Sequence, residues 1–173
     1  RADADAAGQT GDAMMRTLLL LLTAAAAHAA VIRVDPAAVG DGSGSSWPNA
    51  TTSLSAALAA AVAGDEIWVK AGVHRPGAPG AARGTTFQLK ASVAVYGGFA
   101  GGEFARIGRN WRTNRTYLDG DFDADGDLSD NAYRVVTGAL SATLDGFTVR
   151  NGYADGGGAT EGAGLYYSGG GTG

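Results

Sequence analysis

The chain of 173 residues contains no cysteine. A disulfide framework and a Cys-ligated metal centre are therefore excluded, and cysteine usage says nothing about the redox compartment. Histidine is almost as scarce, because His28 falls in the leader described below and only His74 remains. Since His74 ends an expected strand just before Arg75 and Pro76, the sequence predicts a surface position for it.

Familiar catalytic motifs are missing as well. The sequence holds no GxSxG nucleophile elbow, no HExxH helix and no GxxxxGK phosphate loop. The glycine-rich segment 155–164 lacks the strand–loop–helix setting of a nucleotide site, so we interpret it as a loop. The sequence therefore gives no specific support for an enzymatic activity, and whether the protein is catalytic stays open.

An excess of basic residues is also lacking. The formal net charge is −4, and residues 1–29 carry two Arg and three Asp, which leaves −3 for the rest of the chain. A mildly acidic protein has no basic field to attract nucleic acid, so we expect no nucleic-acid partner.

The start of the chain has the features of an export signal. Met14 to Thr17 form a short basic region, an apolar run covers residues 18–27, and Ala27-His28-Ala29 is a small-x-small cleavage triplet. The run of about ten residues is shorter than the ~20 that a membrane-spanning helix needs. We predict a signal peptide at 14–29, an upstream extension at 1–13 that is not native, and an exported protein at the cell surface, at the outer membrane or outside the cell. No later segment is long and apolar enough to span a membrane.

A short helix and a first strand are expected at the beginning of the mature chain. Residues 31–34 alternate weakly as a strand, and 35–49 are rich in turn residues. A helix around residues 53–63 follows, with Leu54, Leu58 and Val62 on one apolar face and Gly64 at its end.

Further short apolar strands recur along the chain. Their expected starts at 67, 93, 117, 144 and 165 lie 26, 24, 27 and 21 residues apart. Such intervals are typical of solenoids, in which each unit buries its apolar face against its neighbours. The sequence therefore predicts an all-β, right-handed parallel β-helix with the helix at 53–63 covering its first turn. A β-sandwich with long loops is the alternative.

An ordered set of segments resembles secreted bacterial right-handed parallel β-helix proteins, many of them surface proteins related to the polymorphic outer-membrane proteins. The resemblance implies a capping helix, a coil from about Glu66, and a domain at 30–173 that continues beyond the sequence. The GGAI and FxxN repeats of the chlamydial branch are absent, so the adhesin and autotransporter roles of that branch do not carry over directly. The segments are AGDEIWVKAGVHRP, FQLKASVAVYGGFAGGE, RNWRTNRTYLDGD, YRVVTG, and LDGFTVRNGYADGGG followed by GAGLYY.

One segment is a candidate metal site. Six of the fourteen acidic residues after position 29 lie between 119 and 130. Clustered carboxylates repel one another, and a hard cation with several oxygen ligands removes that penalty. We therefore predict a structural Ca²⁺ site whose ligands are Asp121, Asp123, Asp125, Asp127 and Asp130. The EF-hand pattern fails at its twelfth position, which is Ala132, so Asp130 has to act in another geometry; a solvated or arginine-paired acidic loop is the alternative.

The segment before the acidic loop carries an arginine at every third position. A groove for a polyanion or an acidic sugar is one interpretation of Arg106, Arg109, Arg112 and Arg115. Solvated charge, with salt bridges to the acidic loop, is the other. Among the three tryptophans, Trp68 is expected in the core and Trp111 at the surface.

These features lead to one expected function and one alternative. We expect a monomeric, adhesin-like scaffold stiffened by Ca²⁺, with a surface polysaccharide or a protein of a host or neighbouring cell as partner. The alternative is a carbohydrate-active enzyme, a polysaccharide lyase or glycosidase, built on the same scaffold.

Overall fold

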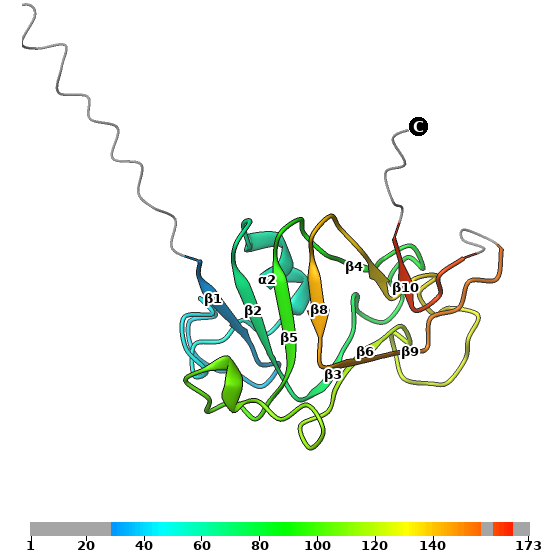
Figure 1. The fold of residues 1–173 in the computed structure, drawn as a ribbon. Coiled ribbons are helices and arrows are strands. Elements are labelled where there is room, and N and C mark those ends of the chain that lie inside the picture. The colour runs from blue at the N-terminus through cyan, green and yellow to red at the C-terminus, as the bar shows by residue number, and fades with distance from the viewer. Residues whose placement is uncertain (1–28, 157–160, 168–173) are drawn as a thin grey trace, which may run out of the picture.

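The computed structural model describes residues 29–156 and 161–167 of the chain (Figure 1). The predicted upstream extension and all of the predicted signal peptide except Ala29 lie outside the described residues. No helix within the described ranges is long and apolar enough to cross a membrane.

The strands form three separate parallel sheets (Figure 1). The first sheet has the order β1 (Val31–Val34), β2 (Glu66–Lys70), β5 (Ala94–Phe99) and β8 (Thr143–Asp145). The second has the order β10 (Leu165–Tyr166), β7 (Val136–Thr137) and β4 (Phe87–Gln88). The third has the order β3 (Gly72–His74), β6 (Thr116–Asp119) and β9 (Phe147–Arg150).

The predicted fold class, an all-β right-handed parallel β-helix, is wrong. Of the described residues, 7% are helical and 27% lie in strands, the sheets are short, and no closed solenoid is detected in this part of the chain. The physical reason is that the strands have only two to six residues, while long connections carry much of the chain: 100–115, whose only regular element is the short 3-10 helix η1 (Arg106–Gly108), and 120–135. An all-β, right-handed parallel β-helix is therefore not what these residues form.

The expected strands are evenly spaced only because strands of three different sheets were counted as one series. The strands that begin near 67, 93, 117, 144 and 165 belong to the first, first, third, first and second sheets. Strands of the first sheet begin at 31, 66, 94 and 143, which are 35, 28 and 49 residues apart. The number of residues between successive strands of the same sheet thus varies, and the sequence has no true structural period.

The short apolar runs nevertheless predicted most strands. The runs at 31–34, 67–70 and 93–96 correspond to β1, β2 and β5. The expected strand at 144–150 is instead two strands, β8 and β9, in different sheets. Gly146 separates them with φ of +84°, a left-handed conformation that favours glycine.

The helix α2 (Leu54–Ala60) lies where the sequence placed it but ends earlier. Ser53 caps its start, because the Ser53 Oγ accepts a hydrogen bond from the Ala56 N–H at 3.2 Å. The helix ends at Ala60, before the expected Gly64, so Val62 leaves the apolar face and is 58% exposed.

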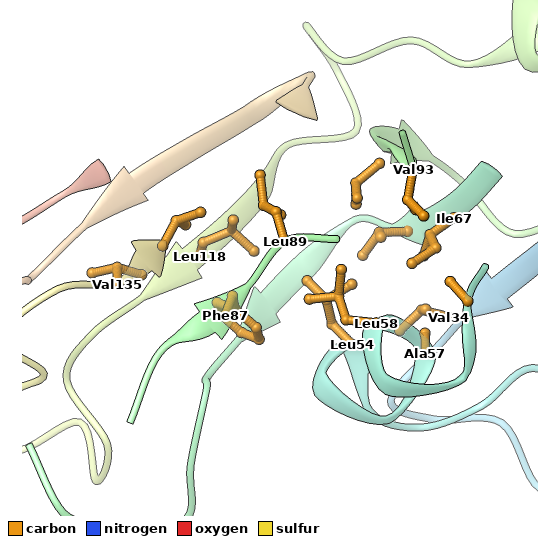
Figure 2. Close-up of a cluster of buried hydrophobic side chains, with 14 residues drawn as sticks. Val34, Leu54, Ala57, Leu58, Ile67, Phe87, Leu89, Val93, Leu118 and Val135 are labelled. Atoms are coloured by element: carbon orange, nitrogen blue, oxygen red, sulfur yellow. The ribbon is translucent and has the colours of Figure 1, made fainter. Parts of the chain in front are cut away.

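The helix contributes to the main core instead of only covering an end. Leu54, Ala57 and Leu58 point from α2 into the cluster that includes Val34 and Ile67 (Figure 2). The cluster continues through residues of all three sheets and their flanks, among them Phe87, Leu89, Val93, Val95, Leu118, Val135 and Val136. A second, smaller aromatic cluster of Trp47, Trp68 and Phe99 packs separately.

Candidate functional site

The acidic loop follows β6 and is fixed at its beginning by Asp119. The Asp119 carboxylate is buried and accepts hydrogen bonds from Arg150 Nε and Nη2 at 2.9 and 2.7 Å and from Asn151 Nδ2 at 2.8 Å. Burial raises the pKa of Asp119, but the bonds from Asn151 and Arg150 outweigh it and hold the pKa below its ordinary value. Asn151 therefore has a structural role.

Three carboxylates of the loop converge. One oxygen from each of Asp121, Asp123 and Asp125 lies within 4.8 Å of the others. Ligands on opposite sides of a Ca²⁺ ion at about 2.4 Å are about 4.8 Å apart, so one ion can contact all three oxygens. Asp121 also holds the turn, since its Oδ1 accepts from the Ala124 N–H at 2.6 Å and its Oδ2 from the Gly126 N–H at 3.3 Å.

The other two predicted ligands behave differently. Both oxygens of Asp127 accept from Ser129, from its N–H at 2.8 Å and its hydroxyl at 2.9 Å, and these bonds lower the pKa of Asp127. Asp130 has a buried Oδ1 without a hydrogen-bond partner among the described residues. Desolvation raises the pKa of Asp130, and the charges of Asp123, Asp125 and Asp127 raise it further.

The end of the loop explains why the EF-hand pattern fails. Ala132, at the position of the last EF-hand ligand, is fully buried, and its N–H donates to the Gly120 carbonyl at 2.9 Å. The chain thus returns to the core at this residue. Beside Asp130, both polar atoms of the buried Asn131 amide lack a partner among the described residues. The donor set that converges on a shared centre is therefore Asp121, Asp123 and Asp125.

The arginines do not pair with the acidic loop in the way the sequence suggested. In the connector, residues 100–115, Arg106 pairs with Glu66 at 2.8 Å and Arg109 pairs with Asp145 at 2.5 Å. No ion pair joins Arg112 or Arg115 to any described residue. Salt bridges from these four arginines to the acidic loop are thus absent from the described part of the chain.

The connector is nevertheless firmly held against the first sheet. Arg106 and Arg109 lie over the Tyr96 ring, 4.5 and 5.0 Å from its centroid, and the Trp47 indole N–H donates to the Glu103 carbonyl at 3.0 Å. Gly98 makes the close approach possible: its φ is +94°, and a Cβ there would lie 2.6 Å from the Trp111 Cα.

The tryptophans lie as expected, whereas the histidine does not. Trp68 is buried against Phe99, and Trp111 is 49% exposed. His74 is buried rather than at the surface, since β3 places it beside the Lys70 carbonyl, 2.9 Å from its Nε2. Burial lowers the pKa of His74.

Sequence reasoning missed the group around His74. Lys70 Nζ pairs with Asp35 Oδ2 at 2.7 Å, and the charge of Asp35 also acts on His74. Asp35 lies 35 residues before Lys70 and in a segment interpreted only as a loop, so no local motif points to the pair. Only the turn chemistry of Asp35, whose Oδ1 accepts from the Ala37 N–H, was visible in the sequence.

Comparisons with known proteins add no further constraint. No protein-family model matches the chain, no curated protein matches it, and no solved structure matches it. The resemblance to secreted bacterial surface proteins therefore stays a prediction.

Proposed function

We propose that this chain is an exported, non-catalytic binding protein whose short parallel sheets carry long, fixed connections, one of them held by Ca²⁺. The observation that carries the proposal is the convergence of Asp121, Asp123 and Asp125 within 4.8 Å in a loop that links β6 to β7. Carboxylate oxygens are the ligands that Ca²⁺ prefers, so the donor set fits the ion.

The surroundings of the three carboxylates agree with a bound cation. Asp130 has a raised pKa because it loses water and lies near Asp123, Asp125 and Asp127, and its buried oxygen has no partner among the described residues. A divalent cation lowers such a pKa and supplies the missing contact. Asp121, Asp123 and Asp125 would hold the ion, Asp130 would complete the set, and Asp127 would support the loop through Ser129.

Thermal unfolding tests the calcium site. We expect the melting temperature of the protein to rise in millimolar Ca²⁺ and to fall back when a chelator is added, because an ion that binds only the folded state stabilises it. The Asp123→Asn, Asp125→Asn double variant should lose this response. Asp41→Asn is the matched control, since Asp41 is an exposed loop carboxylate outside the site. A melting temperature that does not change when Ca²⁺ is added would contradict the proposal.

The binding role is supported by the connector, residues 100–115. Arg106, Arg109 and Glu103 fix its conformation, and the Glu103 carboxylate accepts from the N–H groups of Ala100, Gly101 and Gly102 at 2.6 to 3.0 Å. The same segment leaves large side chains in solvent, with Phe104 98% exposed and Ile107 95% exposed. A fixed segment with exposed side chains is preorganised for a partner. We propose a surface polysaccharide or a protein of a host or neighbouring cell as that partner.

Export is proposed from the leader at 14–29. N-terminal sequencing of the protein recovered outside the cytoplasm should read Ala30-Val31-Ile32, because cleavage is expected after Ala29. Replacing Ala27 and Ala29 with leucine should stop the cleavage. An uncleaved protein that stays in the cytoplasm would contradict this part of the proposal.

The carbohydrate-active alternative has one observation in its favour. Arg75 lies against the calcium loop, with its Nε donating to the Asp121 carbonyl at 2.6 Å. A basic residue next to Ca²⁺ is what a lyase needs to act on an acidic sugar. The bond to the backbone gives Arg75 a simpler role in positioning the loop, so the binding protein is preferred. Release of unsaturated sugar products from a uronate polymer, lost in Arg75→Lys, would reverse this preference.

A further inference from the structure

A pocket away from the acidic loop lies where the connector meets the turn between β8 and β9. Its volume is about 290 Å³, near the lower end of the range of about 300 to 1,000 Å³ for small-molecule sites. The lining residues are Trp111, Arg115, Thr116, Asp145, Gly146, Phe147 and Thr148. They come from two segments about thirty residues apart, which the structure brings together.

We infer that this pocket binds one unit of an acidic polysaccharide, with Trp111 as the platform for the sugar ring and Arg115 as the partner of its carboxylate. The inference rests on the proposed binding function and names its site and ligand class.

Trp111 supplies an apolar surface that is already in place. Its backbone packs against Gly98, and the Asn110 N–H before it donates to the Gly98 carbonyl at 2.9 Å. About half of Trp111 is exposed, at 49%. The C–H face of a sugar ring is apolar and stacks on such a surface, so the ordering entropy lost on binding is small.

The polar groups of the pocket are able to take new partners. Arg115 is exposed and has no side-chain hydrogen bond or ion pair with any described residue, and the same holds for the hydroxyl of Thr148. Asp145 is oriented by Arg109 through its Oδ1, and its side chain is 50% exposed. An oriented carboxylate and a hydroxyl suit the hydroxyl groups of a sugar, which both donate and accept hydrogen bonds.

The charges of the pocket select among ligand classes. A purely apolar ligand leaves Arg115 without a partner, and Asp145, whose charge Arg109 offsets through its Oδ1, disfavours a ligand that carries several anionic groups. A uronate unit satisfies both, because its carboxylate forms a planar, two-bonded pair with a guanidinium while its hydroxyls face Asp145. Arg112, whose guanidinium lies 5.0 Å from the Trp111 ring centroid, adds a second cation beside the indole.

Binding to an array of uronate-containing and neutral oligosaccharides tests the inference, followed by titration of the best uronate ligand and its methyl ester. We expect Trp111→Ala to weaken both ligands at least about tenfold, and Arg115→Ala to weaken the uronate while leaving the ester unchanged. Tyr167→Ala is the matched control, because Tyr167 is an exposed aromatic residue outside both the pocket and the connector. All these positions are exposed, and circular dichroism of each variant checks its fold.

The outcomes separate this inference from the proposed function. Equal affinity for the uronate and its ester, or no binding to any oligosaccharide, would overturn the ligand class. Saccharide binding that survives both Trp111→Ala and Arg115→Ala would overturn the pocket but would leave the protein a binding scaffold. The response to Ca²⁺ tests the proposed function on its own, because the lining residues of the pocket lie outside the acidic loop.

Discussion

Asp119 and His74 are ionisable side chains buried by the fold, and each is matched by a nearby group. Asp119 receives three hydrogen bonds from Arg150 and Asn151. His74 meets a carbonyl group and the Asp35–Lys70 pair. A buried charge or imidazole without such partners is destabilising, so these groups tie the stability of the protein to pH.

Substitution of Asp119 should lower the free energy of unfolding and reduce its dependence on pH. Because its pKa is lowered, its contribution to the free energy of unfolding is complete above about pH 4 and is lost as the pH falls through the lowered pKa. Asp119→Asn should lower the free energy of unfolding at pH 7 by about 2 kcal/mol, since Arg150 loses its ion-pair partner. Urea unfolding at pH 7 and pH 3 should show a smaller difference in the variant. A variant as stable as the parent at pH 7 would contradict this role.

His74 acts in a different pH window. Its pKa is lowered by burial, so its contribution is complete above about pH 6.5 and is lost as the pH falls through the lowered value. His74→Gln should therefore flatten the dependence of the unfolding free energy on pH in the range just below about pH 6.5, as measured by denaturant titrations at several pH values. An unchanged slope in that window would show that His74 does not titrate on folding.

At the scale of elements, the helix α2 is held by its apolar face. Leu58 is buried in the main core, whereas Val62, which follows the end of the helix, is 58% exposed. Leu58→Ala should lower the free energy of unfolding by about 2 to 4 kcal/mol, because it leaves a cavity. Val62→Ala removes fewer atoms at an exposed position and should change it by less than about 0.5 kcal/mol. Equal effects in denaturant titrations would contradict the assigned faces.

Local patterns predicted the elements that are long enough to have a pattern. The alternating or apolar runs of β1, β2 and β5 and the serine cap of α2 were visible in the sequence. Two-residue strands such as β4 have no pattern of their own, because their pairing is decided by β7, nearly fifty residues later. The fold prediction from strand spacing was wrong for the same reason, because the spacing does not indicate which sheet a strand joins.

The two candidate sites differ in how far the sequence could predict them. The proposed calcium donors Asp121, Asp123 and Asp125 are close in sequence, so a turn brings them together and their spacing already indicated a candidate site. Asp127 stays a predicted ligand, and the sequence did not indicate that Ser129 donates to both of its oxygens. The proposed saccharide pocket joins Trp111 to Asp145, and only the three-dimensional fold relates these residues.

At the scale of the whole molecule, three short sheets support long connections, and a binding role requires that those connections are fixed. Ion pairs and aromatic contacts fix the connector at 100–115, and an ion is proposed to fix the loop at 120–131. Arg75 joins this loop to the segment after β3 through the Asp121 carbonyl, and the loop itself links β6 of the third sheet to β7 of the second.

Isothermal titration of the purified protein with Ca²⁺ measures binding at the proposed site itself. We expect saturable heat at about one ion per chain, absent in the Asp123→Asn, Asp125→Asn variant and unchanged in Asp41→Asn. No heat with millimolar Ca²⁺, or equal heat in the double variant, would contradict the proposed site.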